Sequence, residues 1–267
     1  MAAMMTDTVY IFGTGRSLLA LDAEERAYLD AHPRTLGMNR YYLHYERLGI
    51  LPRMLFLSDF NYYADLILRR CIERLQHLGH ALPYYVSETY PQFYRTPAWR
   101  HPVRKRRLRR QLMQQHGYRP EPLPAYDHLV PFPVSNEAPR FHWARDLSQP
   151  LYHRRGSLTV AINLVNILHP GCDVKLLGID LSDAGYFYDE MITDSNRDLW
   201  VDDKHDRSVR EGRHANARPK RHDDFTLCDA MRAVRGEFDR QGRRLLCCNP
   251  RSLLVTDGIL DDAPVIG

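Results

Sequence analysis

Apolar positions along the chain fall into short runs that end in glycine or a polar residue, and into longer stretches with helical spacing. Residues 8–13 form one short run, and residues 173–179 form a second that leads into Gly178-Ile179-Asp180. Both are typical of buried strands. Residues 156–168 have the apolar content of a buried helix, which Pro170-Gly171 would end. Two such strand–turn units predict an open α/β sheet with a ligand crevice outside its strand ends.

The remaining apolar pattern extends this sheet and adds two helices. We expect a helix over 62–79 and an amphipathic helix over 223–241, because apolar residues recur at helical spacing in both. The apolar face of the second helix carries Phe225, Cys228, Met231, Val234 and Phe238. Further short strands are predicted at 35–39, 53–58, 82–87 and, as the last strand, 244–248. The predicted fold class is α/β: one domain over residues 1–267 with a Rossmann-like, open, mainly parallel sheet flanked by helices.

Two long stretches depart from this pattern. Residues 90–150 hold most of the prolines and lack periodicity. They are too long for a simple connection, so we expect an insertion around a short helix at 102–116. Residues 182–222 are polar and rich in Asp, Arg and His. Such a segment is either a disordered loop or a lid over a site.

Basic side chains concentrate in the first of these stretches. The chain has a formal net charge of +4 and a pI near 8.8, and the excess lies in residues 100–110, most densely in Arg104–Arg110. Such a run is either a solvated arginine-rich face or a contact for an anionic membrane surface or acceptor. Nucleic acid is not the expected partner. The oligomeric state stays open, a homo-oligomer included.

Cysteine usage and hydropathy limit the cellular setting. The five cysteines have no C-x-x-C spacing, which indicates core thiols in a reducing compartment rather than a zinc site or a disulfide framework. No apolar run reaches the roughly 18 residues of a membrane-spanning helix, and the first residues lack the regions of a secretory signal. We expect a cytoplasmic protein, peripheral at the inner face of the cytoplasmic membrane if the basic run contacts lipid.

Small and amide side chains gather where the predicted strands end and the apolar helix begins. Such groups form hydrogen bonds without adding bulk, and the amides at the start of a helix favour a negative charge. Together they suit the base, ribose and phosphate of a nucleotide. The alternative is ordinary capping by the serine and turn formation by the glycines. The residues are Gly13, Thr14, Gly15, Asn39, Ser58, Gly156 and Ser157.

Asp180 and His222 are candidates for more specific roles. Asp180 ends a strand, as does the metal-binding D-x-D of sugar transferases, but Ser182 stands at the third position, so no metal is expected. We assign Asp180 to the nucleotide-binding set instead. His222 directly precedes the last predicted helix, and its side chain suits a general base near neutral pH. His205 and His214 share the polar stretch and compete for that role.

Taken in order, these segments resemble glycosyltransferase family 42, the bacterial sialyltransferases that decorate lipooligosaccharide. The matches are short but run in the family's order over residues 8–60 and 150–255. Six motifs of the family have similar counterparts here. They are the G-N-G-P-S-L turn, the C-N-Q-F-Y strand end, the L-S-G-I-D and S-Y-A-F-D stretches, the H-S-K-N-T-D helix and the L-C-P-N-S-L-L strand. In the same order, the counterparts in this chain are Ile11-Phe-Gly-Thr-Gly-Arg-Ser-Leu18, Met38-Asn39-Arg-Tyr-Tyr42, Leu176-Leu-Gly-Ile-Asp180, Gly185-Tyr186-Phe-Tyr-Asp189, His222 with the helix after it, and Leu246-Cys-Cys-Asn-Pro-Arg-Ser-Leu-Leu254.

The resemblance implies a GT-A-like variant of the Rossmann fold, CMP-sialic acid as donor, and inverting transfer to a surface glycan without a metal. It places Asn39 and Ser58, which replaces an asparagine, at the cytidine–ribose part of the donor. Thr14 and Gly15 would lie near the phosphate, and Ser157 near the phosphate or the carboxylate.

The resemblance also implies two catalytic roles. Tyr186 would steady the departing phosphate, and His222 would deprotonate the acceptor hydroxyl. CMP leaves as a stable anion, so hydrogen-bond donors can stabilise it without a cation. The stretch 182–222 would close as a lid that excludes water.

Departures from the family keep alternatives open. Ser182 and Pro219 stand where the family has tyrosines, so Tyr188, Arg218 or Lys220 would have to replace them. The donor is sialic acid or another CMP-activated ulosonic acid such as Kdo, and a non-catalytic nucleotide- or glycan-binding protein of the same fold is a further alternative. An NAD-dependent oxidoreductase is disfavoured, because the G-x-G turn lacks the third glycine of the dinucleotide fingerprint. Acceptor and linkage stay open.

Overall fold

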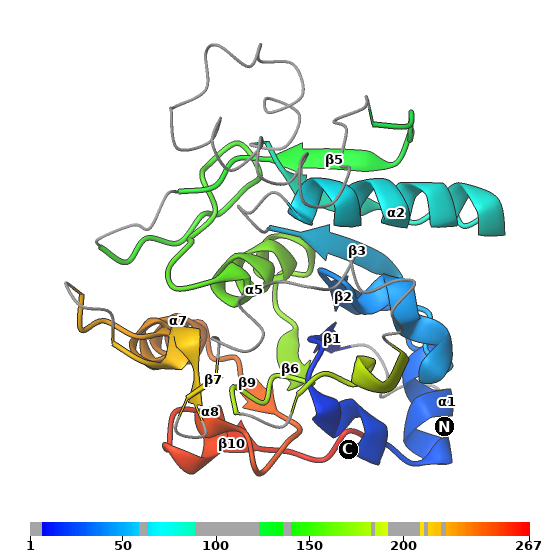
Figure 1. Cartoon of the computed structure of the whole chain (residues 1–267). Helices are drawn as coiled ribbons and strands as arrows, with labels where there is room; N and C mark the ends of the chain where they lie inside the picture. Colours follow the sequence, from blue (N-terminus) through cyan, green and yellow to red (C-terminus); the bar gives the residue numbers. More distant parts are fainter. Residues whose placement is uncertain are drawn as a thin grey trace.

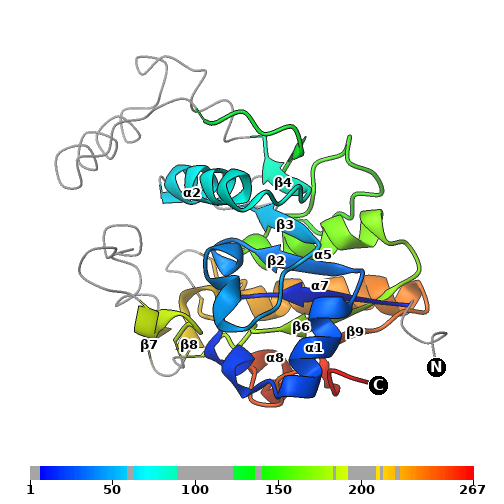
Figure 2. The ribbon, with the colours of Figure 1, turned by 90° about the vertical axis from the view of Figure 1, so that its right-hand side faces the viewer.

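The computed structural model describes residues 7–58, 63–88, 123–135, 140–182, 185–191, 209–210, 213–219 and 223–267. Its centre is an eight-stranded sheet in which each pair of neighbouring strands is parallel (Figures 1 and 2). The strand order is β10-β9-β6-β1-β2-β3-β4-β5. The strands are β1 Thr8–Phe12, β2 Thr35–Met38, β3 Met54–Leu57, β4 Tyr84–Ser87, β5 Leu129–Phe132, β6 Asp173–Leu177, β9 Leu245–Cys247 and β10 Asp261–Asp262.

The strand order reverses once, next to β1. From β1 the chain moves outward through β2, β3, β4 and β5, and then returns to place β6 on the other side of β1. Ligands of open α/β sheets bind outside the carboxyl ends of the strands at such a reversal. The predicted open, mainly parallel Rossmann-like sheet is therefore confirmed. A separate two-stranded antiparallel ribbon joins β7 Val209–Arg210 to β8 Arg213–His214.

Helices cover both faces of the sheet (Figure 1). One face carries α5 Ser157–Leu168 and α7 Leu227–Arg240, and the other carries α1 Ala23–Ala31, η2 Tyr41–Arg47 and α2 Tyr63–Leu78. Side chains of β1 alternate between the two cores, as the pleat of a strand requires: Val9 and Ile11 face α5, whereas Tyr10 and Phe12 face α1 and η2. Short elements complete the chain: η1 Arg16–Ala20, η4 Asp189–Met191, η6 Ala215–Ala217 and α8 Leu253–Thr256.

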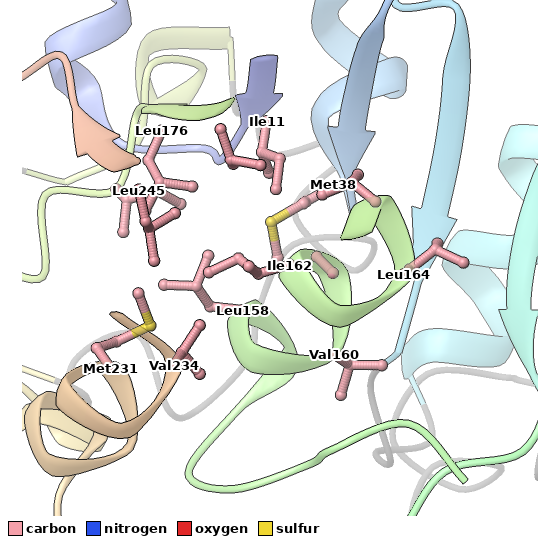
Figure 3. Packing of buried hydrophobic residues seen from close by; sticks show 14 of the residues in the cluster. Ile11, Met38, Leu158, Val160, Ile162, Leu164, Leu176, Met231, Val234 and Leu245 are labelled. Carbon is pink, nitrogen blue, oxygen red and sulfur yellow. The ribbon is translucent and has the colours of Figure 1, made fainter. Parts of the chain in front are cut away.

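The helix α5 lies at the centre of the larger core. Leu158 and Ile162 pack between the sheet residues Ile11 and Met38 and the α7 side chains (Figure 3). Eight consecutive residues from position 158 to 165 are buried, because the sheet covers one side of this helix while α7 and the segment 140–152 cover others. The predicted boundaries of 156–168 agree with the structure to within one residue.

Two edge strands were not predicted. β5 lies inside the stretch interpreted as an insertion, and Pro131 interrupts its short apolar pattern; proline is tolerated there because β5 is an edge strand. The prediction that 244–248 is the last strand is wrong, since β10 follows it. β10 consists of two exposed aspartates, which carry no apolar pattern that could predict a strand.

Part of the predicted insertion belongs to the core. Asn163 of α5 accepts hydrogen bonds from the backbone N–H groups of Ala144 (3.2 Å) and Tyr152 (3.1 Å), and its amide donates to the Ala144 carbonyl. The segment 140–152 is thereby fixed against α5. The helix predicted at 102–116, the run Arg104–Arg110 and His222 lie outside the described residues.

Other sequence predictions concern the core and the membrane. Four of the five thiols are buried, as predicted, and Cys248 is half-buried. Among the described helices, none is long and apolar enough to cross a bilayer.

The close approach of the loops after β1 and β6 generates a stability prediction. The backbone N–H of Gly13 donates to the Leu177 carbonyl at 2.7 Å, and a Cβ at position 13 would lie 2.4 Å from the Gly178 carbonyl oxygen. We expect Gly13→Ala to lower the free energy of unfolding by about 1–3 kcal/mol, as overpacking does, measured by urea denaturation.

Gly236 provides the matched control for this substitution. It lies inside α7, and a Cβ there meets no atom within 4 Å. Gly236→Ala should therefore raise the free energy of unfolding by roughly 0.5–1 kcal/mol through helix propensity. Equal effects of the two substitutions would contradict the packing argument.

Candidate functional site

The carboxylate of Asp180 ties together the loops that follow three neighbouring strands. It is 5% exposed and accepts hydrogen bonds from the backbone N–H of Ser17 (3.0 Å), the Ser17 hydroxyl and the Asn249 side-chain amide (2.8 Å). These partners follow β1 and β9, and Asp180 itself follows β6. A Cβ at Gly15 would lie 2.5 Å from this carboxylate, so the glycine permits the approach of the loop. The contact of Asp180 with a ligand stays a prediction.

The carboxyl ends of β2 and β3 carry buried polar atoms that have no hydrogen-bond partner in the part of the chain that the structure describes. Asn39 adopts a left-handed backbone conformation (φ 52°), and its amide donates to the Ser157 hydroxyl at 3.1 Å. Its Oδ1 atom is buried and has no hydrogen-bond partner. The same holds for the hydroxyl of Ser58, which is 2% exposed.

These two residues belong to the same side of the sheet. Met38 of β2 pairs with Phe56 of β3, and the N–H of Asn39 donates to the Phe56 carbonyl at 2.7 Å. Met54 and Phe56 face the α5 core, so the alternation of the strand directs Ser58 to that side too. An unsatisfied buried polar group is unfavourable, and hydrogen bonds from a bound polar ligand would remove that cost.

The start of α5 adjoins these atoms through Ser157. Gly156 is the N-cap residue, with φ 131°, and no side chain caps the helix. Ser157 bonds to Asn39 instead of capping, so the capping alternative is wrong. A Cβ at Gly156 would lie 2.8 Å from the side-chain amide nitrogen of Asn216, which places η6 against this helix start. The positive end of the α5 dipole is therefore surrounded by amide and hydroxyl groups.

Residues 185–191, which we call the aromatic strap, pack against the loop after β1. Gly15 and Tyr186 form an antiparallel bridge, and the N–H of Phe187 donates to the Thr14 carbonyl at 3.1 Å. Phe187 and Tyr188 are each 1% exposed and belong to the core on the α1 and η2 side. The strap lies within the stretch predicted as a lid, yet it is a fixed part of the fold.

Two rings of the strap, Tyr186 and Tyr188, form a continuous stack with the ring of His44 in η2. The rings of Tyr186 and Tyr188 lie 5.2 Å apart at an interplanar angle of 10°, and those of Tyr188 and His44 lie 4.4 Å apart at 24°. Burial raises the pKa of Tyr188 above its ordinary value, and the nearby Arg40 opposes part of this shift. Its burial also prevents Tyr188 from replacing a missing tyrosine by direct contact with a ligand.

A buried arginine connects the start of α5 to the start of α7. The Arg155 side chain is fully buried; it donates to the carbonyl of Asp223 at 2.5 Å and to that of Phe225. Arg154 forms an ion pair with the Asp223 carboxylate at 2.9 Å and lies over the Phe225 ring at 4.8 Å. Asp223 directly follows His222 in the sequence, so the anchor begins one residue after the candidate base.

The structure thus unites some predicted residues and leaves others apart or undescribed. Asn39, Ser58, Gly156 and Ser157 share one side of the sheet edge, whereas Gly13, Thr14, Gly15 and Tyr186 lie where the β1 loop meets the strap. His214 is half-buried, and its ring nitrogen accepts from the backbone N–H of Asn216 at 3.2 Å. His205 and His222 lie outside the described residues. The contributions of Ser17, Arg155, Asn216 and Asn249 were not predicted.

Neither metal ligation nor similarity to other proteins assigns a role to this site. Within the described ranges, His, Cys, Asp and Glu side chains form no group of three or more suited to a metal ion. Comparison of the chain with protein-family models, with curated proteins and with solved structures gives no match. The fold defines the class as a Rossmann-like α/β protein.

His44 generates a prediction about stability in acid. Burial, with smaller contributions from Arg74 and Arg40, lowers its pKa from 6.5 to about 4. The unfolded chain therefore binds a proton below pH 6.5 that the folded protein accepts only near pH 4. Stability should fall by about 3 kcal/mol from this group as the pH drops across that window, at 1.36 kcal/mol per pKa unit.

The variant His44→Gln tests this origin. It should remove that part of the pH dependence, measured as the free energy of unfolding between pH 7 and pH 4. The exposed His77 offers the control, since His77→Gln should leave the slope unchanged. An unchanged slope in His44→Gln would contradict the assignment.

Proposed function

We propose that this protein is an inverting, metal-independent glycosyltransferase that moves sialic acid from CMP-sialic acid to a surface-glycan acceptor of the lipooligosaccharide or capsule type. The observation that carries the proposal is the pair of buried polar atoms that have no hydrogen-bond partner among the described residues, Ser58 Oγ and Asn39 Oδ1, together with the bond from the Asn39 amide to Ser157 at the start of α5. The order of motifs shared with family 42 supports the same assignment. Ligands of open α/β sheets bind outside the carboxyl ends of the strands, which is the edge where these atoms lie.

In this proposal the donor spans the carboxyl edge of the sheet. Asn39 and Ser58 hydrogen-bond the cytidine–ribose part, which satisfies both of their buried oxygens. Thr14 and Gly15 lie near the phosphate, and Ser157 with the start of α5 stabilises the phosphate or the carboxylate. Asp180 stabilises this arrangement, because its carboxylate fixes the loop that carries Gly15.

The chemical step is a single displacement at the anomeric carbon. His222 takes the proton of the acceptor hydroxyl, whose oxygen attacks that carbon from the face opposite the phosphate. The bond from the carbon to the phosphate oxygen breaks, its electron pair stays on CMP, and the configuration inverts. Tyr186 donates a hydrogen bond to the departing phosphate. Such donors act where negative charge develops.

The basic run Arg104–Arg110 supports a location at the inner face of the cytoplasmic membrane. Clusters of this kind attract anionic headgroups, and a lipid-linked acceptor would be presented there. A phosphorylated glycan core offers the same chemistry.

CMP release tests the proposal directly. We expect the protein to release CMP from CMP-sialic acid when a lipooligosaccharide acceptor is present, with no added metal ion. Release from CMP-Kdo instead would reassign the donor within the same class. Binding of CMP without release from either donor would favour the non-catalytic alternative, and absence of both binding and release would overturn the proposal.

The variant His222→Ala tests the base. Loss of a positioned general base should lower the transfer rate by about 10²- to 10⁴-fold, while the affinity for CMP, measured by calorimetry, changes little. His77→Ala, an exposed histidine on α2, is the control and should transfer at the normal rate. Transfer by His222→Ala at the normal rate would remove His222 from the mechanism.

A further inference from the structure

We propose that Asn39 orients the hydroxyl of Ser157 toward an anionic group of the donor; this inference rests on the proposed function. The side-chain amide of Asn39 donates a hydrogen bond to the Ser157 hydroxyl oxygen at 3.1 Å. The bond joins the carboxyl end of β2 to the first residue of α5. Toward the anion, Asn39 is therefore a positioning residue that acts through Ser157, in addition to its own contact with the cytidine–ribose part.

The backbone holds the Asn39 amide in a defined place. Its N–H donates to the Phe56 carbonyl of β3 at 2.7 Å, and its φ of 52° lies in the left-handed region. Asparagine adopts this region more readily than most other residues. The amide therefore extends toward α5 from a backbone that β3 fixes.

The bond from Asn39 determines what the Ser157 hydroxyl can do for a ligand. A serine hydroxyl donates one hydrogen and accepts through two lone pairs. Because the Asn39 amide donates to it, the oxygen is the acceptor in this bond, and the hydroxyl hydrogen is left for a different acceptor. Among the described residues, the bond to Asn39 is the one hydrogen bond of this hydroxyl. Ser157 is thus prepared to donate to a ligand.

The surroundings of Ser157 favour an anion as that ligand group. The first N–H groups of α5 carry the positive end of the helix dipole, and no side chain caps them. Ser58, at the end of β3, independently indicates a polar ligand at this edge, because it is 2% exposed and its hydroxyl has no hydrogen-bond partner among the described residues. A phosphate or carboxylate oxygen would accept both from the Ser157 hydroxyl and from the N–H groups of the helix.

The other end of the Asn39 amide selects a different part of the donor. Its Oδ1 atom is buried without a hydrogen-bond partner among the described residues, and a carbonyl oxygen only accepts. The ligand group next to Oδ1 must therefore donate a hydrogen, as a ribose hydroxyl or the amino group of cytosine does. One amide thus binds the neutral nucleoside with its oxygen and directs Ser157 to the anion with its nitrogen.

Calorimetric titration with cytidine, CMP and a non-transferable CMP-sialic acid analogue tests the contact of Ser157. If the hydroxyl binds the phosphate, Ser157→Ala should lower the affinity for CMP relative to cytidine by about 10- to 100-fold, as loss of a hydrogen bond to a charged group does. If it binds the carboxylate, the affinity for the analogue relative to CMP should fall instead. Ser157→Thr keeps the hydroxyl and should recover most of either ratio. A Ser157→Ala variant that changes neither ratio would overturn the inference.

A double-mutant cycle tests the role of Asn39. Glycine accepts the left-handed backbone, so Asn39→Gly removes the amide without strain. Loss of its Oδ1 should weaken all three ligands alike. In addition, the affinity ratio that Ser157→Ala lowers should fall by roughly 3- to 10-fold, the effect of a typical hydrogen bond. Added to Ser157→Ala, Asn39→Gly should change that ratio no further, because the hydroxyl that it orients is gone. An equal fall with and without Ser157 would overturn the positioning role.

Asn166 provides the matched control, and the unaltered protein separates this inference from the proposed function. Asn166 lies near the other end of α5, where its side chain accepts from Arg243, so Asn166→Ala should bind all three ligands normally. If the unaltered protein binds CMP and Asn39→Gly leaves both affinity ratios normal, the positioning role is overturned while the nucleotide site stands. If the unaltered protein binds none of the three ligands, the proposed function is overturned and the inference falls with it.

Discussion

The candidate site depends on one buried carboxylate, that of Asp180, at the place where the strand order reverses. A buried carboxylate is stable only with several donors, and Ser17 and Asn249 supply them from the loops after β1 and β9. The loops can approach only because positions 13 and 15 are glycine. Internal contacts thus occupy the β1–β6 junction, whereas Asn39 Oδ1 and Ser58 Oγ, which have no hydrogen-bond partner among the described residues, lie at the ends of β2 and β3.

The second constraint is the packing of the aromatic strap into the core. A sequence average over 182–222 is polar, yet Phe187 and Tyr188 inside it are as buried as the central strands. They complete the core on the η2 side and hold Tyr186 next to Gly15. Glu190 adds exposed ion pairs to Arg16 and Arg47, which are individually weak in water. Burial of the rings, more than the surface charges, fixes the strap.

Sequence patterns predicted the elements that repeat apolar residues over several turns or strand positions. The helix α5, the strand β6 and the face of α7 carrying Met231 follow directly from such patterns. β5 and β10 are short, and neither has a continuous apolar pattern, because β5 contains a proline and β10 consists of two aspartates. At the site, Asn39 and Ser58 were predictable because they end strands, whereas Asn216 owes its place to the close approach of η6 to Gly156.

The start of α5 shows how the fold fixes the segment that begins at Asp223. Arg155 has a left-handed backbone (φ 61°), a conformation that costs a non-glycine residue about 1 kcal/mol or more. The strain is offset by its buried bonds to Asp223 and Phe225. The chain is thus anchored beside Ser157 at 223 and beside Gly15 at 185–187. Residues 185–187 and Asp223 are therefore each held next to residues that we propose to contact the donor.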